Sequence, residues 1–401
     1  MPKESSNTTG PTKATPTAYA AETTNATATA NAAPTPSTKA DRADRIYNFS
    51  SGPSMLPLSV LEQAAAEMTN YRGSGMSVME MSHRSKTYID IFDETKSDLK
   101  RILSVPDTHE ILFMQGGATF QFSAVPLNLI GKTGKADYAV TGNFSELAMK
   151  EAKKYGEVHI ACSSADRNHT YIPSQAELSL SDGASYFYYC ANNTIYGTEW
   201  KYVPDAGSAP LACDMSSNIL SQPVDVSKYG LLYAGVQKNM APAGMAVVIV
   251  DKSLAGGELP YTPKLMSYQL MIDSDSMNNT PPCFTIYMLG LVLKWLDTQG
   301  GVEGMSRIKT EKAKIIYDAI DGSSFYTGCA EKAARSDMNV TFRTPSDELD
   351  NKFVKESLKE GFDNLKGHRI AGGLRASIYN AMPMQGALEL ARFMREFESR
   401  A

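Results

Sequence analysis

The sequence predicts an α/β protein: a mainly parallel sheet covered by helices on both faces, followed by a smaller α/β unit. Three observations predict this class. Short apolar runs alternate with amphipathic helical segments between residues 109 and 237, which is typical of parallel strands joined by crossover helices. Polar residues follow two of these runs, Asp214 after one and Lys238 after another. The last 60 or so residues repeat strand, helix, strand, helix, which indicates a compact second unit.

The length and composition limit the domain organisation and the classes of binding partner. A chain of 401 residues with 42% hydrophobic residues suggests two domains beyond any tail, and we expect a large domain at 45–300 and a small one at 301–401. We leave open whether the first residues after 45 pack on the small domain. The net charge of −5, without a block of lysine and arginine, gives little support for binding nucleic acid or an anionic membrane.

The cysteines and the apolar runs indicate the cellular compartment of the protein. The five cysteines are widely spread and form no CxxC pair, which argues against a disulfide framework or a zinc site and favours a reducing compartment. No apolar run approaches the roughly 18 residues of a membrane helix. We therefore expect a cytoplasmic protein that binds no metal.

Residues 1–44 differ from the rest of the chain, because Ala, Thr, Asn, Ser and Pro dominate them. Such a segment buries too little surface to offset its ordering entropy, so we expect disorder. It lacks the apolar core of a secretory signal. Import into an organelle remains an alternative, since the segment is rich in hydroxyl groups, although its first arginine is Arg42.

The first elements of the globular part are two amphipathic helices, 60–71 and 87–103, the second with Tyr88 and Phe92 among its periodic apolar residues. Strand 109–115 and a Gly116–Gly117 turn lead into a helix. Thr280, in NNTPP, is expected to cap the helix that ends near residue 300. The other predicted elements are strands 136–142, 157–162, 184–190, 210–216, 231–237, 245–250, 338–345 and 372–380, and helices 144–156, 304–321, 349–365 and 387–398.

Lys238 and Asp214 are the candidate catalytic residues. A lysine between two buried strands is costly, because an ammonium loses its hydration there, and proteins prepare Schiff-base lysines in this way. Alternatively, Lys238 ends a strand and its ammonium reaches water. An aspartate on a neighbouring strand end favours the first interpretation, because a lysine and an aspartate are the simplest apparatus for pyridoxal phosphate. The Gly116–Gly117 turn offers amides to a phosphate, or merely solves a backbone problem.

Several motifs together resemble one enzyme family, over nearly all the chain from Tyr47 onward. The motifs are NFSSGPSMLP, SHRS, QFSAVPLNL, DMSSNILSQPVDVSKYG with YAGVQKN, NNTPP and GHRIAGGLRASIYNAMP. They resemble the phosphoserine aminotransferases, in class V of the fold-type I pyridoxal-phosphate enzymes. The resemblance implies a homodimer with shared sites. It also implies reversible amino transfer from L-glutamate to 3-phosphohydroxypyruvate, giving O-phospho-L-serine and 2-oxoglutarate in L-serine biosynthesis.

The resemblance also implies roles for residues around the cofactor. Lys238 would form the Schiff base and move the proton between the substrate α-carbon and the cofactor's C4′, while Asp214 would pair with the pyridinium nitrogen. Thr194 would bond the phenolic side of the ring and Phe144 would stack on it, where most members have tryptophan. The residues implied for the cofactor phosphate are Ala118, Thr119 and Gln237, joined by Asn279 and Thr280 from the other subunit.

Histidines and arginines are implied for the two anionic ends of the substrate. Arg375, in GGLRAS, would clamp the α-carboxylate, for which the planar arginine fork is suited. Many bacterial members have an arginine where this chain has Thr119, which bears on how strongly the substrate phosphate is held. The residues implied for the substrate phosphate are His83, Arg84, His368 and Arg369.

Other functions remain as alternatives. The nearest is another class V enzyme, such as an alanine–glyoxylate aminotransferase or a cysteine desulfurase, for which Cys329 is the only loose candidate as persulfide carrier. A non-catalytic module that binds pyridoxal phosphate is a second, although it would not need the Arg375 clamp. A nicotinamide enzyme is less favoured, because the Gly-Gly turn lacks the third spaced glycine of a dinucleotide fingerprint.

Overall fold

The computed structural model describes residues 45–401, and the segment 1–44 that we predict to be disordered lies outside the described residues. Its main sheet has seven strands in the order β2-β10-β9-β8-β5-β3-β4. Only β10 runs opposite in direction to the other strands of this sheet, so the predicted mainly parallel α/β fold is confirmed. The strands are β2 (His109–Gln115), β3 (Lys135–Val140), β4 (Glu157–Ser163), β5 (Phe187–Cys190), β8 (Leu211–Asp214), β9 (Leu231–Gly235) and β10 (Met245–Asp251).

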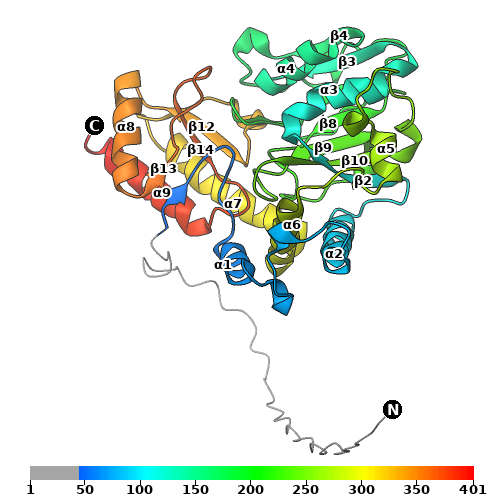
Figure 1. Cartoon of the computed structure of the whole chain (residues 1–401). Coiled ribbons are helices and arrows are strands. Elements are labelled where there is room, and N and C mark those ends of the chain that lie inside the picture. Colours follow the sequence, from blue (N-terminus) through cyan, green and yellow to red (C-terminus); the bar gives the residue numbers. More distant parts are fainter. Residues whose placement is uncertain (1–44) are drawn as a thin grey trace, which may run out of the picture. The chain divides into compact units, whose positions relative to one another are not determined.

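Helices cover both faces of this sheet (Figure 1). Along β2, Ile111 and Phe113 join the core under α1, α2 and α6, whereas Leu112 and Met114 join the core under α3, α4 and α5. This alternation follows from the two-residue period of a strand. The helices are α1 (Leu58–Glu67), α2 (Lys86–Ile102), α3 (Gly117–Leu129), α4 (Asn143–Ala152), α5 (Tyr268–Asp273) and α6 (Cys283–Thr298).

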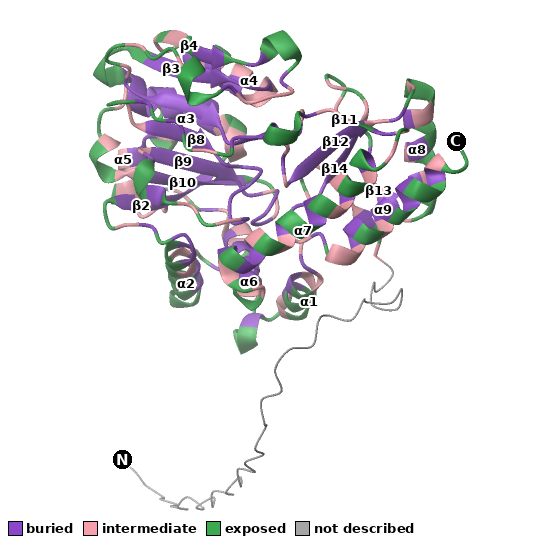
Figure 2. Ribbon diagram, turned by 180° about the vertical axis from the view of Figure 1, so that it is seen from behind, coloured by how far each residue is buried: buried purple, intermediate pink, exposed green. Residues whose placement is uncertain are grey.

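A second, antiparallel sheet of β11 (Thr327–Gly328), β12 (Asn339–Arg343) and β14 (Leu374–Ser377) follows in the chain. It has its own core, in which aromatic rings such as Phe342 and Phe353 pack edge to face at 5.9 Å between centroids. The buried faces of both sheets stand out in Figure 2. The helices that accompany it are α7 (Gly301–Asp321), α8 (Asp347–Lys359) and α9 (Met384–Glu398).

The start of the globular part packs with this second core. Strand β1 (Tyr47–Asn48) pairs in parallel with β13 (Phe362–Asp363), and Phe49 lies in the same core. The loop that follows β1 therefore runs from the second core toward the main sheet. The division of the chain at residue 300 stays a prediction.

Several predicted helix ends are wrong. The helices predicted to end at residues 71 and 156 end at Glu67 and Ala152, and two further errors have a clear cause. Thr280 does not cap α6, which begins three residues later, after Pro282. Each of the two prolines disfavours helical geometry in the residue before it, so the helix starts only beyond both. The helix predicted at 349–365 ends at Lys359, because Gly361 has a φ of +85° and the next residues pair with β1.

Candidate active site

A cavity of about 140 Å³ lies at the carboxyl ends of β5, β8 and β9. Ligands gather at this edge in parallel α/β sheets. The loop after β1, the first turns of α3 and α4, and β14 of the second sheet complete its wall. Nine of the predicted site residues line it: Ala118, Thr119, Phe144, Thr194, Asp214, Gln237, Lys238, His368 and Arg375.

Lys238 is buried in this cavity and reaches two hydroxyl groups. Its Nζ donates to Thr194 Oγ1 at 2.8 Å and to Ser217 Oγ at 2.7 Å. The ring centroid of Phe144 lies 5.6 Å from the same nitrogen, within the range of a cation–π contact. Only 8% of the residue is exposed, so the interpretation of a lysine that reaches water is wrong.

Asp214 ends β8 and presents a buried carboxylate to the same cavity. Its Oδ1 accepts from the backbone amide of Ser216 at 2.8 Å, and its Oδ2 accepts from the Tyr233 hydroxyl at 3.2 Å. The Tyr233 hydroxyl also lies 2.7 Å from that of Tyr188. A buried carboxylate needs such partners, and the chain of hydroxyls fixes its orientation.

The N-terminus of α3 forms another part of the wall. Gly116 and Gly117 have φ values of +93° and +68°, which a residue with a side chain adopts only with strain. Gly235 allows β9 to approach the helix, since a Cβ there would lie 3.0 Å from that of Ala118. The first amides of a helix have no partner within the helix, and its dipole favours an anion. Ala118, Thr119 and the nearby Gln237 are thus suited to a phosphate.

Arg375 enters the cavity from β14. It donates to Ser51 Oγ at 2.8 Å and to the carbonyl oxygen of Thr194 at 3.3 Å, while its buried Nε has no partner among the described residues. Burial lowers the pKa of Arg375. Burial also lowers the pKa of His368, with further contributions from the charges of Arg375 and Arg369. An incompletely bonded, buried guanidinium is suited to a carboxylate ligand.

The donor set fits pyridoxal phosphate. An amine for the aldehyde carbon, a carboxylate for the ring nitrogen, an aromatic side chain and a helix N-terminus for the phosphate all line one cavity. Within residues 45–401, no group of three or more His, Cys, Asp or Glu side chains is placed to hold a metal ion. No helix in the same range is long and apolar enough to cross a membrane.

Five predicted residues lie outside this cavity in the single chain. Arg84, Thr280 and Arg369 are exposed, and His83 has a buried Nε2 without a partner among the described residues. Asn279 is half-buried beside Thr280. Their roles stay predictions, and for Asn279 and Thr280 the predicted partner is the other subunit.

Two further residues of the site, Ser51 and Ser217, are not among the predicted ones. Ser51 lies in NFSSGP and Ser217 in DMSSN, two motifs that carry the family resemblance. The polar pair Ser216–Ser217, one residue beyond the strand-ending Asp214, was a local signal for Ser217. For Ser51 the sequence gives no such signal, because its contact with Arg375 joins residues 324 positions apart.

Comparisons with known proteins show the family of this chain. The family described as "Aminotransferase class-V" matches residues 46–390. A phosphoserine aminotransferase of Desulfosudis oleivorans is 51% identical over 88% of this chain and 98% of its own, and that of Nitrosomonas europaea is 50% identical with the same coverage. An alanine–glyoxylate aminotransferase of Nostoc sp. shares the fold alone, at 15% identity and a TM-score of 0.69.

Solved structures extend the comparison. The phosphoserine aminotransferase of Bacillus circulans subsp. alkalophilus superposes with a TM-score of 0.88 at 46% identity, over 90% of this chain and 100% of that one. The enzyme of Trichomonas vaginalis, solved with pyridoxal phosphate bound, gives a TM-score of 0.84 at 41% identity, over 88% and 100%. The chain therefore belongs to the class V aminotransferases and, within them, to the phosphoserine aminotransferase family.

Proposed function

We propose that this enzyme transfers an amino group reversibly between L-glutamate and 3-phosphohydroxypyruvate, giving O-phospho-L-serine and 2-oxoglutarate, in L-serine biosynthesis. The observation that carries the proposal is the Arg375 guanidinium, which shares the cavity of Lys238 and keeps a buried Nε without a protein partner. Both amino-acid substrates carry an α-carboxylate for that group. Curated relatives 46–51% identical, named phosphoserine aminotransferase, support the same reaction.

The cofactor is pyridoxal phosphate, whose protonated ring supplies the electron sink that makes the α-proton of an amino acid labile. Asp214 would hold the ring nitrogen, Phe144 would stack on the ring, and Thr194 would bond its phenolic side. The amides of Ala118 and Thr119, with Gln237, would hold the phosphate at the start of α3.

The chain's own groups bind the substrate and move the proton. Arg375 would fix the α-carboxylate and so orient the α-carbon toward Lys238. The Nζ of Lys238 would take the proton from the α-carbon as general base, with the hydroxyls of Thr194 and Ser217 controlling its position. His368 and Arg369, with His83 and Arg84, would meet the second anionic group, which distinguishes phosphoserine from serine.

We further propose a homodimer with shared sites, in the cytoplasm. The single-chain cavity lacks five predicted residues, and Asn279 and Thr280 of the partner subunit would complete its phosphate end. Exposed apolar side chains shortly before His83 in the chain support an interface: Met76 and Met79 are 44% and 58% exposed. Import directed by residues 1–44 is the alternative location.

The visible absorption of the purified enzyme tests the reaction. O-phosphoserine alone should bleach the cofactor band, whereas serine, alanine and cysteine should not, and 2-oxoglutarate should then restore it. The matched variant Lys238→Ala should show no cycle. If alanine or cysteine works equally well, the substrate assignment falls while the family remains.

Mixing two inactive variants tests the shared site. If the sites are shared, Lys238→Ala and Thr280→Asp chains that exchange subunits form hybrids with one intact site each. Random exchange should then restore about a quarter of wild-type activity, since half the dimers are hybrids with one good site. No recovery despite exchange would contradict shared sites.

A further inference from the structure

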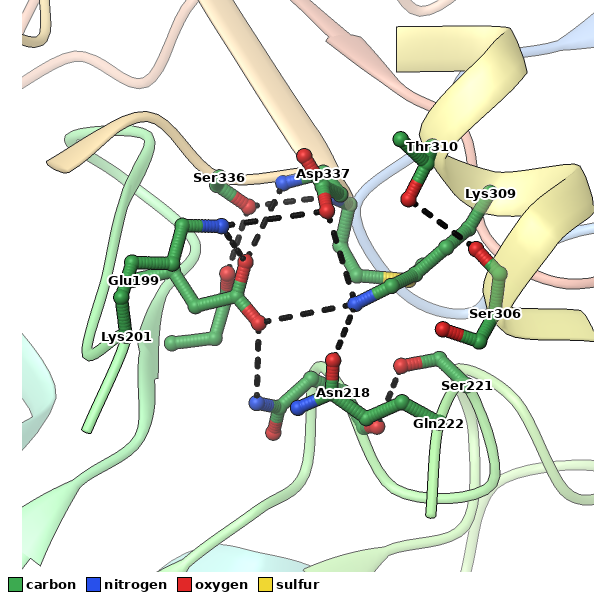
Figure 3. Close-up of polar contacts among 12 residues, drawn as sticks. Glu199, Lys201, Asn218, Ser221, Gln222, Ser306, Lys309, Thr310, Ser336 and Asp337 are labelled. Carbon is green, nitrogen blue, oxygen red and sulfur yellow. Dashed lines mark hydrogen bonds and ion pairs between the residues drawn. The ribbon is translucent and has the colours of Figure 1, made fainter. Parts of the chain in front are cut away.

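Four charged side chains form a largely buried cluster outside the cavity, with two positive and two negative groups (Figure 3). One carboxylate oxygen of Glu199 lies 2.8 Å from Lys201 Nζ, and the other lies 3.9 Å from Lys309 Nζ. Asp337 lies 3.5 Å from Lys309 and 3.8 Å from Lys201. The side chains of Glu199 and Lys309 are 1% and 3% exposed.

Burying this cluster costs free energy, because its charged groups lose their hydration. Burial alone would raise the pKa of Glu199, but the charges of Lys201 and Lys309 outweigh it and hold that pKa below its usual value. Glu199 is therefore an anion inside the protein. Apolar residues of similar volume often stabilise a protein as well as a buried ion pair does, so stability alone does not explain the cluster.

Glu199 joins the two segments that hold the hydrogen-bond partners of Lys238. It ends the short hairpin of β6 (Asn192–Asn193) and β7 (Thr198–Glu199), whose turn carries Thr194. Its Oε1 also accepts from Asn218 Nδ2 at 3.4 Å, next to Ser217. Thr194 and Ser217 are the residues whose hydroxyls bind Lys238 Nζ.

The second sheet and α7 complete the connection. The backbone amide of Asp337, just before β12, donates to Glu199 Oε2 at 3.2 Å. Lys309, on α7, donates to Gln222 Oε1 at 2.5 Å, in the segment that continues from Ser217. Glu199 thus contacts the Thr194 hairpin, the Ser217 loop and, through Lys309, helix α7.

We propose that Glu199 is a positioning residue, which fixes Thr194 and Ser217 against Lys238 Nζ through its hydrogen bonds from Asn218 and the Asp337 amide and its ion pair with Lys309. The proposal rests on the assignment of Lys238 as the reactive amine. Hydroxyls that move away from this nitrogen change its hydrogen bonds, and hence its affinity for a proton. Glu199 touches neither substrate nor cofactor, so its effect passes through the two hydroxyls.

Two variants separate positioning from stability. Glu199→Gln keeps the shape of the side chain but leaves Lys309 less well paired, and it should lower the melting temperature. The double variant Glu199→Gln/Lys309→Met removes both charges and should recover most of that loss. Lys314→Met is the control, because it removes the charge of an exposed lysine on the same helix as Lys309 without touching the cluster.

The main measurement is the pH titration of the visible band of the cofactor-loaded enzyme, which needs no substrate, together with kcat. In both Glu199 variants the titration midpoint should shift by about half a pH unit or more and kcat should fall about tenfold or more. Lys314→Met should stay close to wild type in both. The proposal is overturned if the midpoint stays at the wild-type value, or if kcat and midpoint recover with stability in the double variant. A wrong substrate assignment would leave the titration result intact.

Discussion

Replacing Lys312 by methionine should remove a specific pH dependence from the stability of the protein. The Lys312 side chain is fully buried on α7, and its Nζ donates to the carbonyl oxygens of Tyr379 at 2.8 Å, Met382 at 2.9 Å and Asn380 at 3.4 Å. Burial lowers the pKa of Lys312 from 10.5 to about 7. The three carbonyl groups favour the ammonium and oppose this fall.

The magnitude follows from proton linkage at Lys312. Between pH 7 and 10.5 the unfolded chain keeps a proton that the folded chain releases, so stability rises with pH in this window. The slope is at most about 1.4 kcal/mol per pH unit. Because the folded group is half protonated at pH 7, the gain from pH 7 to 9 is about 2 kcal/mol. Below pH 7 the penalty for the buried ammonium is present in full.

Urea unfolding of wild type and Lys312→Met at pH 7, 8 and 9 measures this effect. The difference between the two free energies of unfolding cancels the other titrating groups and should grow by about 2 kcal/mol in favour of wild type. Lys314→Met is the control, because that side chain is 70% exposed on the same helix, and it should follow wild type. Parallel curves for wild type and Lys312→Met would refute the reasoning, since the carbonyls would then hold the proton throughout.

Three further predictions concern the hairpin, the thiols and the substrate clamp. Gly197→Ala, with a φ of +74° and a Cβ placed 2.4 Å from Thr341 Oγ1, should lower the free energy of unfolding by about 2–4 kcal/mol. Gly183→Ala, with a φ of +71° and open space, should lower it by about 1 kcal/mol, and equal losses in urea unfolding would contradict the steric argument. Burial raises the pKa of the Cys329 thiol, so this residue should react slowly with a disulfide reagent at pH 8, and fast labelling would favour the desulfurase alternative. Arg375→Lys should lower kcat/KM for glutamate and phosphoserine alike, by about 10–100-fold, and a loss for one substrate only would argue against an α-carboxylate clamp.

Local pattern was sufficient to predict most of the fold. Strand β2 has the predicted bounds, and the periodic Tyr88 and Phe92 are both buried on α2. The errors lie where distant or conformational effects decide, as at Pro281 and Pro282 before α6 and at the pairing of β1 with β13. Hydrophobic periodicity carries no information on either effect.

The two central site residues were predictable for a topological reason. Asp214 ends β8 and Lys238 follows β9, and the carboxyl ends of neighbouring parallel strands meet at one edge of the sheet. The partners of Lys238 were harder to predict. Thr194 and Ser217 lie 44 and 21 positions away, in loops whose meeting depends on the completed sheet.

Glu199 and Lys309 show why buried charges are informative. From sequence, a glutamate and a lysine are assigned to the surface, because such residues are rarely buried. The fold buries both, and a buried charge persists only where partners compensate its lost hydration. Asp214, Lys238 and Arg375 are buried at the cavity, where the proposed binding and proton transfer would explain their cost. Glu199 and Lys309 contact the loops that carry Thr194 and Ser217. These contacts favour the proposed contribution to the positioning of Lys238 as the explanation for their burial.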